Sequence, residues 1–271
     1  MSLITLSTDF GTKDPDLGRL KGDILNLIPN AELVDVSHNI TPYNTEEAVY
    51  IIQHSLPHFP KGSIHLIGFN SETHLNNQPI LIQANGQYFM GNDNGILLKA
   101  LNDFETMNFK LNDTDFKRFM QPHIRAAQKI INKTPIHNFA TPTNDLHQLN
   151  LVQPKLVYAG NAVNKIVTRV IYTDNYGNAV FNIKKKEFET WRQQRNFVIK
   201  TGIVEIDAML QNYNDYIKSR DDISKYAGKA MARFNDNEHL EVFIYHSNRQ
   251  TGGANTLLGL RNNMEIIIQF D

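Results

Sequence analysis

The chain has no cysteine among its 271 residues. Disulfides, thiolate catalysis and cysteine-ligated zinc are therefore excluded. Long apolar runs are also absent, so we expect neither a membrane span nor a membrane partner. The sequence begins MSLITL and passes directly into a strand pattern, without the charged and apolar leader of a secreted protein. These absences together predict a cytoplasmic protein.

A surplus of charge of one sign is missing as well. The 27 lysines and arginines nearly balance the 28 aspartates and glutamates, and the net charge is −1. Because nucleic-acid binding depends on positive charge, we expect no nucleic acid as a partner. The HExxH, GxSxG and GxGxxG motifs are absent too, which argues against a metal site, a serine hydrolase and a dinucleotide fold. The expected ligand is a small molecule.

The remaining composition is that of an ordinary globular protein, with 41% hydrophobic and 20% charged residues. Strand and helix patterns alternate in the first part of the chain, which predicts an α/β domain with a largely parallel sheet over residues 1–160. Several short strands separated by turns follow, which predicts a β-barrel-like domain over residues 161–271.

The expected elements follow from periodicity, turn residues and helix caps. Helices are expected to begin at Pro15 and near Thr45, and to cover 122–132, 186–192 and the region near 224–234. Asn85 and Gly86 predict a tight hairpin turn. Beyond the first strand, strands are expected over residues 31–36, 63–69, 79–83, 87–90, 165–172, 179–183, 197–200, 240–245 and 264–270.

The segment 4–22, ITLSTDFGTKDPDLGRLKG, joins the first strand to the first helix. The strand is expected to stop at Gly11, and Asp14 precedes Pro15 as an N-cap precedes the first helical residue. In open α/β sheets such a loop lies at the carboxyl ends of the strands, where ligands bind. From these residues alone, Asp14 is either a cap or a ligand contact, and Asp9 either a turn residue or a ligand contact.

The run TDFG..D...G..KG resembles the opening of the S-adenosylmethionine (SAM) hydroxide adenosyltransferase and halogenase family, which includes fluorinase and chlorinase enzymes. The resemblance implies that Asp9 binds the ribose hydroxyls, and that Phe10, Asp14 and Asp16 border the ligand. VDVSHNITPYNTEEA is similar to the family's VDITHEIPPQDVEAGA, which implies that Tyr43 packs against the sugar. Without the resemblance, plain packing explains a loop tyrosine after proline equally well.

Two later segments also resemble the family. IYTDNYGNAVFNI is similar to its VDRFGNLVTNI pattern, which implies that Asp174 holds the amino-acid end and Asn178 the adenine edge. HLEVFIYHSNRQTGGANTLLGLR resembles LEIAVN.GNAA..LGL, with a longer loop. The resemblance implies ligand contacts from Ser247, Asn248 and Ala254, and the insertion leaves their placement open.

The chain departs from the family at the groups that handle water. In hydroxide-using members an aspartate, an arginine and a histidine position or deprotonate the water, whereas this chain has Asn70, then Asn77 or Gln78, and Met120. Asparagine and glutamine neither act as a base nor supply charge. The ordinary hydroxide mechanism is therefore in question for this chain.

Two replacements for these groups are available in the same loop. Thr73 falls near the place of the fluorinase's halide-binding threonine, and Glu72 with His74 offers an acid and base pair. Together with Asn70, these are the candidate catalytic residues. Loop residues of these types are more often simply solvated, so positioning alone and binding without turnover also stay open.

The resemblance implies a SAM-binding protein that cleaves SAM to adenosine and L-methionine by attack of water at the ribose C5′. The alternative is a non-catalytic binder or sensor of adenosyl compounds, and a halogenase is the third possibility. No cofactor beyond SAM itself and no metal is expected. The resemblance also implies a homotrimer, with each site between the first domain of one subunit and the second domain of its neighbour.

Overall fold

The computed structural model describes residues 2–69, 78–115, 120–247 and 251–271. The chain divides into two compact units, Met1–Asn150 and Leu151–Asp271. The first unit ends earlier than the expected boundary at residue 160. The reason is that strand β8 (Lys155–Ala159) pairs with a strand of the second unit, β9 (Ala162–Thr173). Within the described ranges, every helix is too short or too polar to cross a bilayer.

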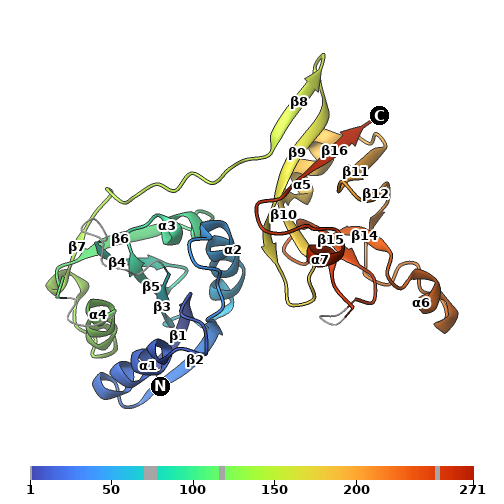
Figure 1. Ribbon diagram of the computed structural model, residues 1–271. Helices are drawn as coiled ribbons and strands as arrows, with labels where there is room; N and C mark the ends of the chain where they lie inside the picture. Colours follow the sequence, from blue (N-terminus) through green and yellow to red (C-terminus); the bar gives the residue numbers. More distant parts are fainter. Residues whose placement is uncertain (1, 70–77, 116–119, 248–250) are drawn as a thin grey trace. The chain divides into compact units, whose positions relative to one another are not determined.

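The first unit contains a seven-stranded sheet in the order β2-β1-β3-β5-β4-β6-β7 (Figure 1). The strands β2, β1, β3 and β5 run parallel, and β4, β6 and β7 complete the sheet in antiparallel pairs. The predicted α/β unit with its largely parallel sheet is confirmed. The strands are β1 (Ser2–Thr8), β2 (Ala31–Ser37), β3 (Ile64–Gly68), β4 (Pro79–Ala84), β5 (Gln87–Asn92), β6 (Thr106–Leu111) and β7 (Ala140–Pro142).

Helices cover both faces of this sheet. Helix α1 packs against α4, and α2 packs against α3 on the other side (Figure 1). The core on the α1 and α4 face is built from apolar residues such as Ile4, Leu6, Ile24 and Ile124, all of them fully buried. The helices are α1 (Pro15–Leu27), α2 (Thr45–Ser55), α3 (Ile96–Ala100) and α4 (Gln121–Ile131), with short 3₁₀ turns at Leu56–His58 and Ile136–Asn138.

The predicted starts of the first two helices are confirmed. Helix α1 begins at Pro15, and the extended Asp14 precedes it without a side-chain cap hydrogen bond. Helix α2 begins after Asn44, whose side chain accepts the backbone N–H of Glu47 at 3.2 Å. Proline at the first helical position needs no hydrogen-bond partner for its nitrogen, so α1 starts there even without a capping side chain.

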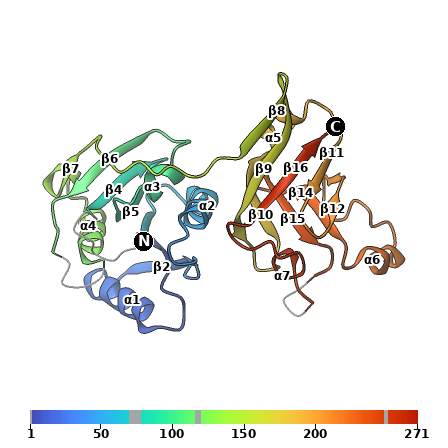
Figure 2. The same cartoon turned by 45° about the horizontal axis from the view of Figure 1, so that its top comes forward.

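The second unit is a nine-stranded sheet that curls into half of a barrel (Figure 2). Its core gathers large aromatic side chains, among them Phe181, Phe188 and Phe270. The expected β-barrel-like fold is thus confirmed. Besides β8 and β9, the elements are β10 (Ala179–Lys184), α5 (Lys185–Arg192), β11 (Phe197–Lys200), β12 (Glu205–Ile206), β13 (Met209–Leu210), α6 (Arg220–Tyr226), β14 (Ala230–Phe234), β15 (His239–Ile244), α7 (Ala254–Leu257) and β16 (Glu265–Phe270).

The helix expected near residues 224–234 is wrong in its second half. Helix α6 stops at Tyr226, and Gly228 follows with a φ of +79°, a backbone conformation that suits glycine. Residues 230–234 are strand β14, which pairs antiparallel with β15. The antiparallel ladder with the next strand, β15, outweighs the local helical pattern, because strand pairing and burial decide the conformation of such a segment more than its own propensity.

Candidate functional site

The carboxyl ends of the parallel strands bring together the loops that carry the first predicted site residues. Thr8, at the end of β1, pairs with Gly68 at the end of β3. The half-buried Asp9 and Phe10 follow directly after Thr8. The backbone N–H of Gly11 donates to the carbonyl of His38 at 2.7 Å, which ties this loop to the one after β2. Asp9 therefore lies at the carboxyl edge of the parallel strands, the edge where open α/β sheets bind their ligands.

Gly68 marks a tight contact at this edge. A β carbon on Gly68 would lie 2.9 Å from Phe10 Cζ, 2.9 Å from Met120 Sδ and 3.2 Å from Thr8 Cγ2. The side chains of Phe10 and Met120 thus meet over the glycine, and only a residue without a side chain leaves them room. Met120 is buried and precedes α4 with a φ of +56°. Met120, which the resemblance alone aligns with the family's histidine, therefore presents a thioether beside Phe10, and a thioether transfers no proton.

The other predicted residues of the first unit lie at its surface. Tyr43 is 75% exposed, and its φ is +64°. Such exposure argues against a role in the core of this unit. Asp14 is exposed, and Asp16 forms an exposed ion pair with Arg19 at 3.1 Å. These three side chains are accessible to a ligand or to another chain.

The four candidate catalytic residues, Asn70, Glu72, Thr73 and His74, lie outside the described residues, as do Asn77 and Asn248. Gln78 is described, and its side-chain amide donates to the carbonyl of Leu111 at 2.8 Å. Gln78 is therefore anchored to β6.

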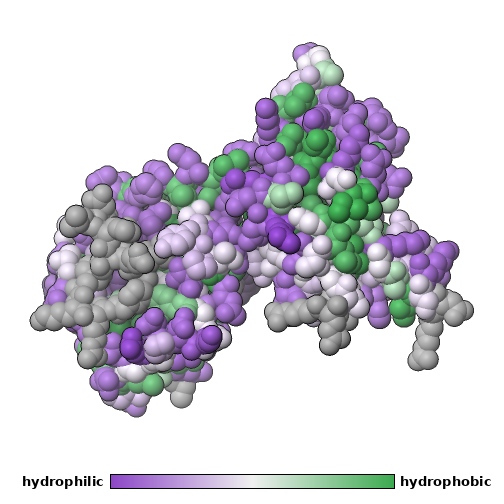
Figure 3. All heavy atoms as spheres, in the orientation of Figure 1, coloured by the Kyte–Doolittle hydropathy of each residue, from purple (hydrophilic) through white to green (hydrophobic). Residues whose placement is uncertain are grey.

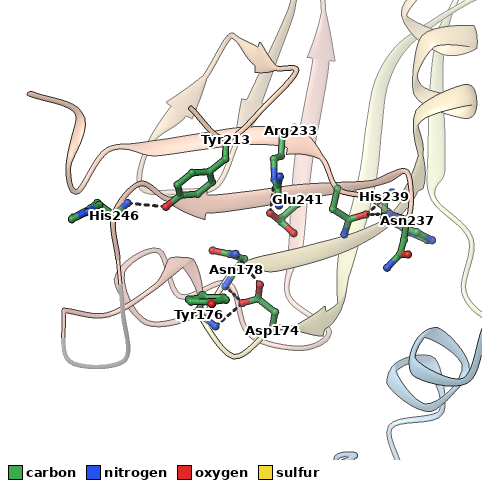
Figure 4. A network of polar contacts seen from close by, with 10 residues as sticks. Asp174, Tyr176, Asn178, Tyr213, Arg233, Asn237, His239, Glu241 and His246 are labelled. Atoms are coloured by element: carbon green, nitrogen blue, oxygen red, sulfur yellow. Dashed lines mark hydrogen bonds and ion pairs between the residues drawn. The ribbon is translucent and has the colours of Figure 1, made fainter. Parts of the chain in front are cut away.

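Asp174 and Asn178 come together in the turn between β9 and β10 (Figure 4). One carboxylate oxygen of Asp174 accepts the backbone N–H groups of Tyr176 at 2.8 Å and Asn178 at 2.9 Å. The other accepts the side-chain amide of Asn178, also at 2.8 Å. Gly177 completes the turn with a φ of +82°. The carboxylate that the resemblance assigns to the ligand is thus itself held rigidly by the turn.

A second loop packs against this turn. The backbone N–H of Asn255 donates to the carbonyl of Gly177 at 3.0 Å. A β carbon on Gly253 would lie 2.5 Å from the carbonyl oxygen of Tyr176, so the two backbones approach as closely as glycine permits. Ala254 is fully buried at this contact. The structure therefore brings Ala254 to the Asp174 turn, and the half-buried Ser247 lies just beyond β15.

An ion pair lies close enough to Asp174 to interact with it electrostatically. The Arg233 side chain donates from Nε to Glu241 Oε1 at 3.0 Å, and Glu241 is only 4% exposed (Figure 4). Burial raises the pKa of the Glu241 carboxyl, the nearby Asp174 adds to this, and the Arg233 guanidinium opposes it without cancelling it. Sequence reasoning missed this pair, because Arg233 faces Glu241 only across the β14 and β15 ladder.

The same view shows two tyrosines, Tyr213 and, inside the turn, Tyr176 (Figure 4). Tyr213 stacks on Phe243 with ring centroids 4.9 Å apart, and its hydroxyl accepts the backbone N–H of His246 at 3.0 Å (Figure 4). Tyr176, inside the turn, is 64% exposed. Flat apolar rings of this kind suit a planar heterocycle such as a nucleobase. Tyr213 was not among the predicted residues, because no motif surrounds it.

A metal centre finds no support among residues 2–69, 78–115, 120–247 and 251–271, which contain no cluster of three or more potential ligands. The polar side chains described above are carboxylates and amides, with tyrosine rings in the same unit.

An α/β unit with a polar loop at its strand ends, followed by a curled β unit, also occurs in solved structures. An uncharacterized conserved protein from Thermotoga maritima matches with a TM-score of 0.77 and 19% identity, covering 98% of this chain and 99% of that one. A conserved hypothetical protein from Thermus thermophilus matches with a TM-score of 0.69 and 19% identity, covering 100% of both chains. These similarities establish the fold.

The family follows from the sequence. Residues 4–139 match the SAM hydroxide adenosyltransferase N-terminal domain, and residues 168–267 match the C-terminal domain of the same family. The chain belongs to the SAM hydroxide adenosyltransferase family, and the resemblance noted from its motifs is confirmed.

Relatives with named activities include hydrolases and a halogenase. An (R)-S-adenosyl-L-methionine hydrolase from Methanocaldococcus jannaschii is 27% identical over 206 residues, which cover 74% of this chain and 73% of the relative. A second protein of that name, from Salinispora arenicola, is 26% identical over 97 residues, 36% of this chain and 37% of the relative. A fluorinase from Actinoplanes sp. is 39% identical over 64 residues, 23% of this chain and 21% of the relative.

Proposed function

We propose that this protein binds SAM and cleaves it to adenosine and L-methionine. The observation that carries the proposal is that both family domains are present in order, with a relative named as a SAM hydrolase aligned over 74% of the chain. In this reaction a water oxygen forms a bond to the ribose C5′, and the C5′–S bond breaks. Its electron pair goes to sulfur, and a proton is released.

The chemistry asks little of the protein besides placement. The sulfonium makes methionine a good leaving group, so the nucleophile must mainly be held in line and stripped of bulk water. Asp9 is the proposed ribose ligand, with Phe10, Asp14, Asp16 and Tyr43 bordering the nucleoside. The position of Asp9 directly after β1, at the carboxyl edge of the sheet, supports the role of ribose ligand.

The second unit supplies the other proposed contacts. Asp174 receives the amino-acid end of the ligand and Asn178 the adenine edge, with Ser247, Asn248 and Ala254 around them. The rigid turn supports this assignment, because a carboxylate already fixed by two backbone N–H groups loses little freedom when a ligand binds. Neither a metal nor a further cofactor is required by this chemistry.

A second candidate function is binding without turnover. It is favoured by Met120, which is buried beside Phe10 and which the resemblance aligns with the histidine of hydroxide-using members. The candidates for replacing the lost groups are Asn70, Glu72, Thr73 and His74. Halide transfer, through Thr73, is the third possibility.

Product analysis separates the three functions. The protein is incubated with SAM, with and without chloride or fluoride, and the products are resolved by chromatography and mass spectrometry. Adenosine and methionine in equal amounts, formed more slowly by the Asp9→Ala variant at low SAM concentration, support hydrolysis. A 5′-halogenated adenosine supports halide transfer. Binding of SAM in calorimetry with no product supports the non-catalytic binder, and neither binding nor product overturns all three.

We also propose that the protein is a homotrimer in the cytoplasm, with each site shared between neighbouring subunits. Hydrophobic side chains gather on the face of the second unit that carries β8 and β9 (Figure 3), where Val157 and Tyr158 are 39% and 59% exposed. Exposed apolar patches mark protein interfaces. Asp9→Ala and Asp174→Ala chains, mixed and reassembled, should then regain some binding sites. A monomer with full ligand affinity in sedimentation would contradict the trimer.

A further inference from the structure

Four polar side chains form a continuous chain of contacts behind Asp9. Thr8 Oγ1 lies 2.8 Å from His38 Nδ1, and His38 Nε2 lies 3.1 Å from Asp35 Oδ1. Lys21 Nζ donates to the other oxygen of Asp35 at 2.6 Å. Thr8 and His38 are buried, at 0% and 5% exposure, while Asp35 and Lys21 reach the surface. This series of contacts thus leads from Lys21 at the surface to Thr8, the residue directly before Asp9.

The contacts also reach the backbone of the loop. The backbone N–H of Phe10 donates to Thr8 Oγ1 at 3.4 Å, so this hydroxyl lies between Phe10 and His38 Nδ1. On the other side of the ring, His38 Nε2 faces the Asp35 carboxylate. Burial alone would raise the pKa of Asp35, but hydrogen bonds from Lys21 and His38 outweigh it and hold the pKa below its usual range. Asp35 is therefore charged at neutral pH and holds a negative charge 3.1 Å from His38 Nε2.

His38 also acts through its backbone, because its carbonyl accepts the N–H of Gly11 at 2.7 Å. Asp9 and Phe10 lie between two points, Thr8 and Gly11, that are both held by the same histidine. We propose that His38 is a positioning residue that fixes the direction in which Asp9 presents its carboxylate to the ligand. This inference rests on the proposed function, in which Asp9 accepts the ribose hydroxyls.

The same sheet contains a second threonine and histidine pair, which serves as a control for the Thr8 and His38 pair. Thr5, on the same strand β1, lies with its Oγ1 2.7 Å from His65 Nδ1, and both residues are fully buried. Burial lowers the pKa of His65 to about 4, so this histidine is neutral at neutral pH. Both pairs join a threonine hydroxyl of β1 to the Nδ1 atom of a buried histidine. The Thr5 and His65 pair, however, lies within the sheet, away from the turn that carries Asp9.

The experiment compares ligand affinity and stability in His38→Leu and His65→Leu. Both variants lose a buried histidine contact, so both should lower the free energy of unfolding. Only His38→Leu should also weaken adenosine binding, by about tenfold, because the loop must then be ordered when the ligand binds. His38→Asn should bind adenosine more tightly than His38→Leu, since the asparagine side chain still offers Thr8 a hydrogen-bonding group. Thr8→Val, which removes the hydroxyl but keeps the shape, should weaken binding as His38→Leu does.

The outcomes separate this inference from the proposed function. If the unmodified protein does not bind adenosine, or Asp9→Ala binds as tightly as it does, the proposed function fails. If Asp9→Ala weakens binding while His38→Leu and His65→Leu bind alike, the positioning role is overturned. Should His38→Leu fail to fold, His38→Asn and Thr8→Val decide instead, and full affinity in Thr8→Val contradicts the role.

Discussion

The side-chain amide of Asn178 donates to the carboxylate of Asp174 at 2.8 Å. The two residues to which the family resemblance assigns opposite ends of the ligand therefore form one hydrogen-bonded unit. A ligand group that binds Asp174 or Asn178 therefore contacts a side chain that is already oriented by the other of these two residues. This arrangement makes the contributions of the two residues interdependent.

The first prediction is that Asp174→Ala and Asn178→Ala are not additive. Each change removes the partner of the other side chain, so the double variant should lose about as much affinity for SAM as the worse single variant. A coupling energy of about 0.5–3 kcal/mol is typical for residues in direct contact. Calorimetric titration of the four proteins measures it. Asp174→Ala combined with Asp145→Ala, an exposed surface change, should be additive.

The second prediction concerns Asp9. A carboxylate that accepts two ribose hydroxyls makes charge-assisted hydrogen bonds, typically about 1.5–3 kcal/mol in net effect. Asp9→Ala should therefore weaken adenosine binding by about tenfold to a hundredfold. Asp145→Ala, which removes the same charge from a side chain that is 98% exposed, should leave the affinity unchanged. Equal adenosine affinities of Asp9→Ala and Asp145→Ala would contradict the role of Asp9 as a ribose ligand.

The third prediction is that hydrolysis is slow and that restored charges accelerate it. Loss of a general base typically costs about 10²–10⁴-fold in rate. The combined variant with Asn70→Asp, Asn77→Arg and Met120→His should release adenosine faster. At position 120 the new imidazole would lie beside Phe10, where burial favours its neutral, basic form.

The matched control combines Asn70→Asp and Asn77→Arg with Met107→His and keeps Met120. Met107 is 60% exposed on β6, so a histidine there should not accelerate the reaction. If the unmodified protein already matches the rate of relatives with the charged groups, this prediction is wrong. Glu72, Thr73 and His74 then become the residues to change.

The fourth prediction is a dependence of stability on pH at Glu241. Burial raises the pKa of Glu241 above its ordinary value of 4.5, so the folded state binds this proton more tightly than the unfolded state. The stabilisation is complete below the unfolded pKa and is lost as pH rises through the folded pKa. Relative to the unmodified protein, Glu241→Gln should therefore gain stability as pH rises from about 4 to 7 in urea unfolding. A difference that stays constant with pH would contradict the raised pKa.

The fifth prediction uses two glycines. A β carbon on Gly253 would lie 2.5 Å from the carbonyl oxygen of Tyr176 and 2.7 Å from Gly177 Cα, both backbone atoms. Gly253→Ala should displace the turn that holds Asp174 and weaken SAM binding and stability together. Gly22→Ala, in α1 with nothing within 4 Å, should stabilise by about 0.5–1 kcal/mol and leave binding unchanged. Thermal unfolding and calorimetry measure both effects.

Local chemistry explains which elements could be predicted from the sequence. Pro15 starts α1 because proline sets its own backbone angle, and Asn85 with Gly86 turns between β4 and β5 with φ values of +50° and +73°. Strand β11 was predicted at its observed bounds, Phe197–Lys200. In each case the signal lies within a few residues of the element that it specifies.

The sequence by itself determined the family, the α/β unit followed by a curled β unit, and the two motifs around Asp9 and Asp174. These depend on residue types at fixed spacing along the chain. The tertiary structure alone decided that residues 230–234 form a strand, and that Arg233 meets Glu241 across it. It also decided that Met120 packs beside Phe10 over Gly68. The contact of Met120 and Phe10 over Gly68 joins segments far apart in sequence, and close packing specifies it. The strand and the Arg233 pair depend on the register of a hydrogen-bond ladder, which periodicity along the chain does not reveal.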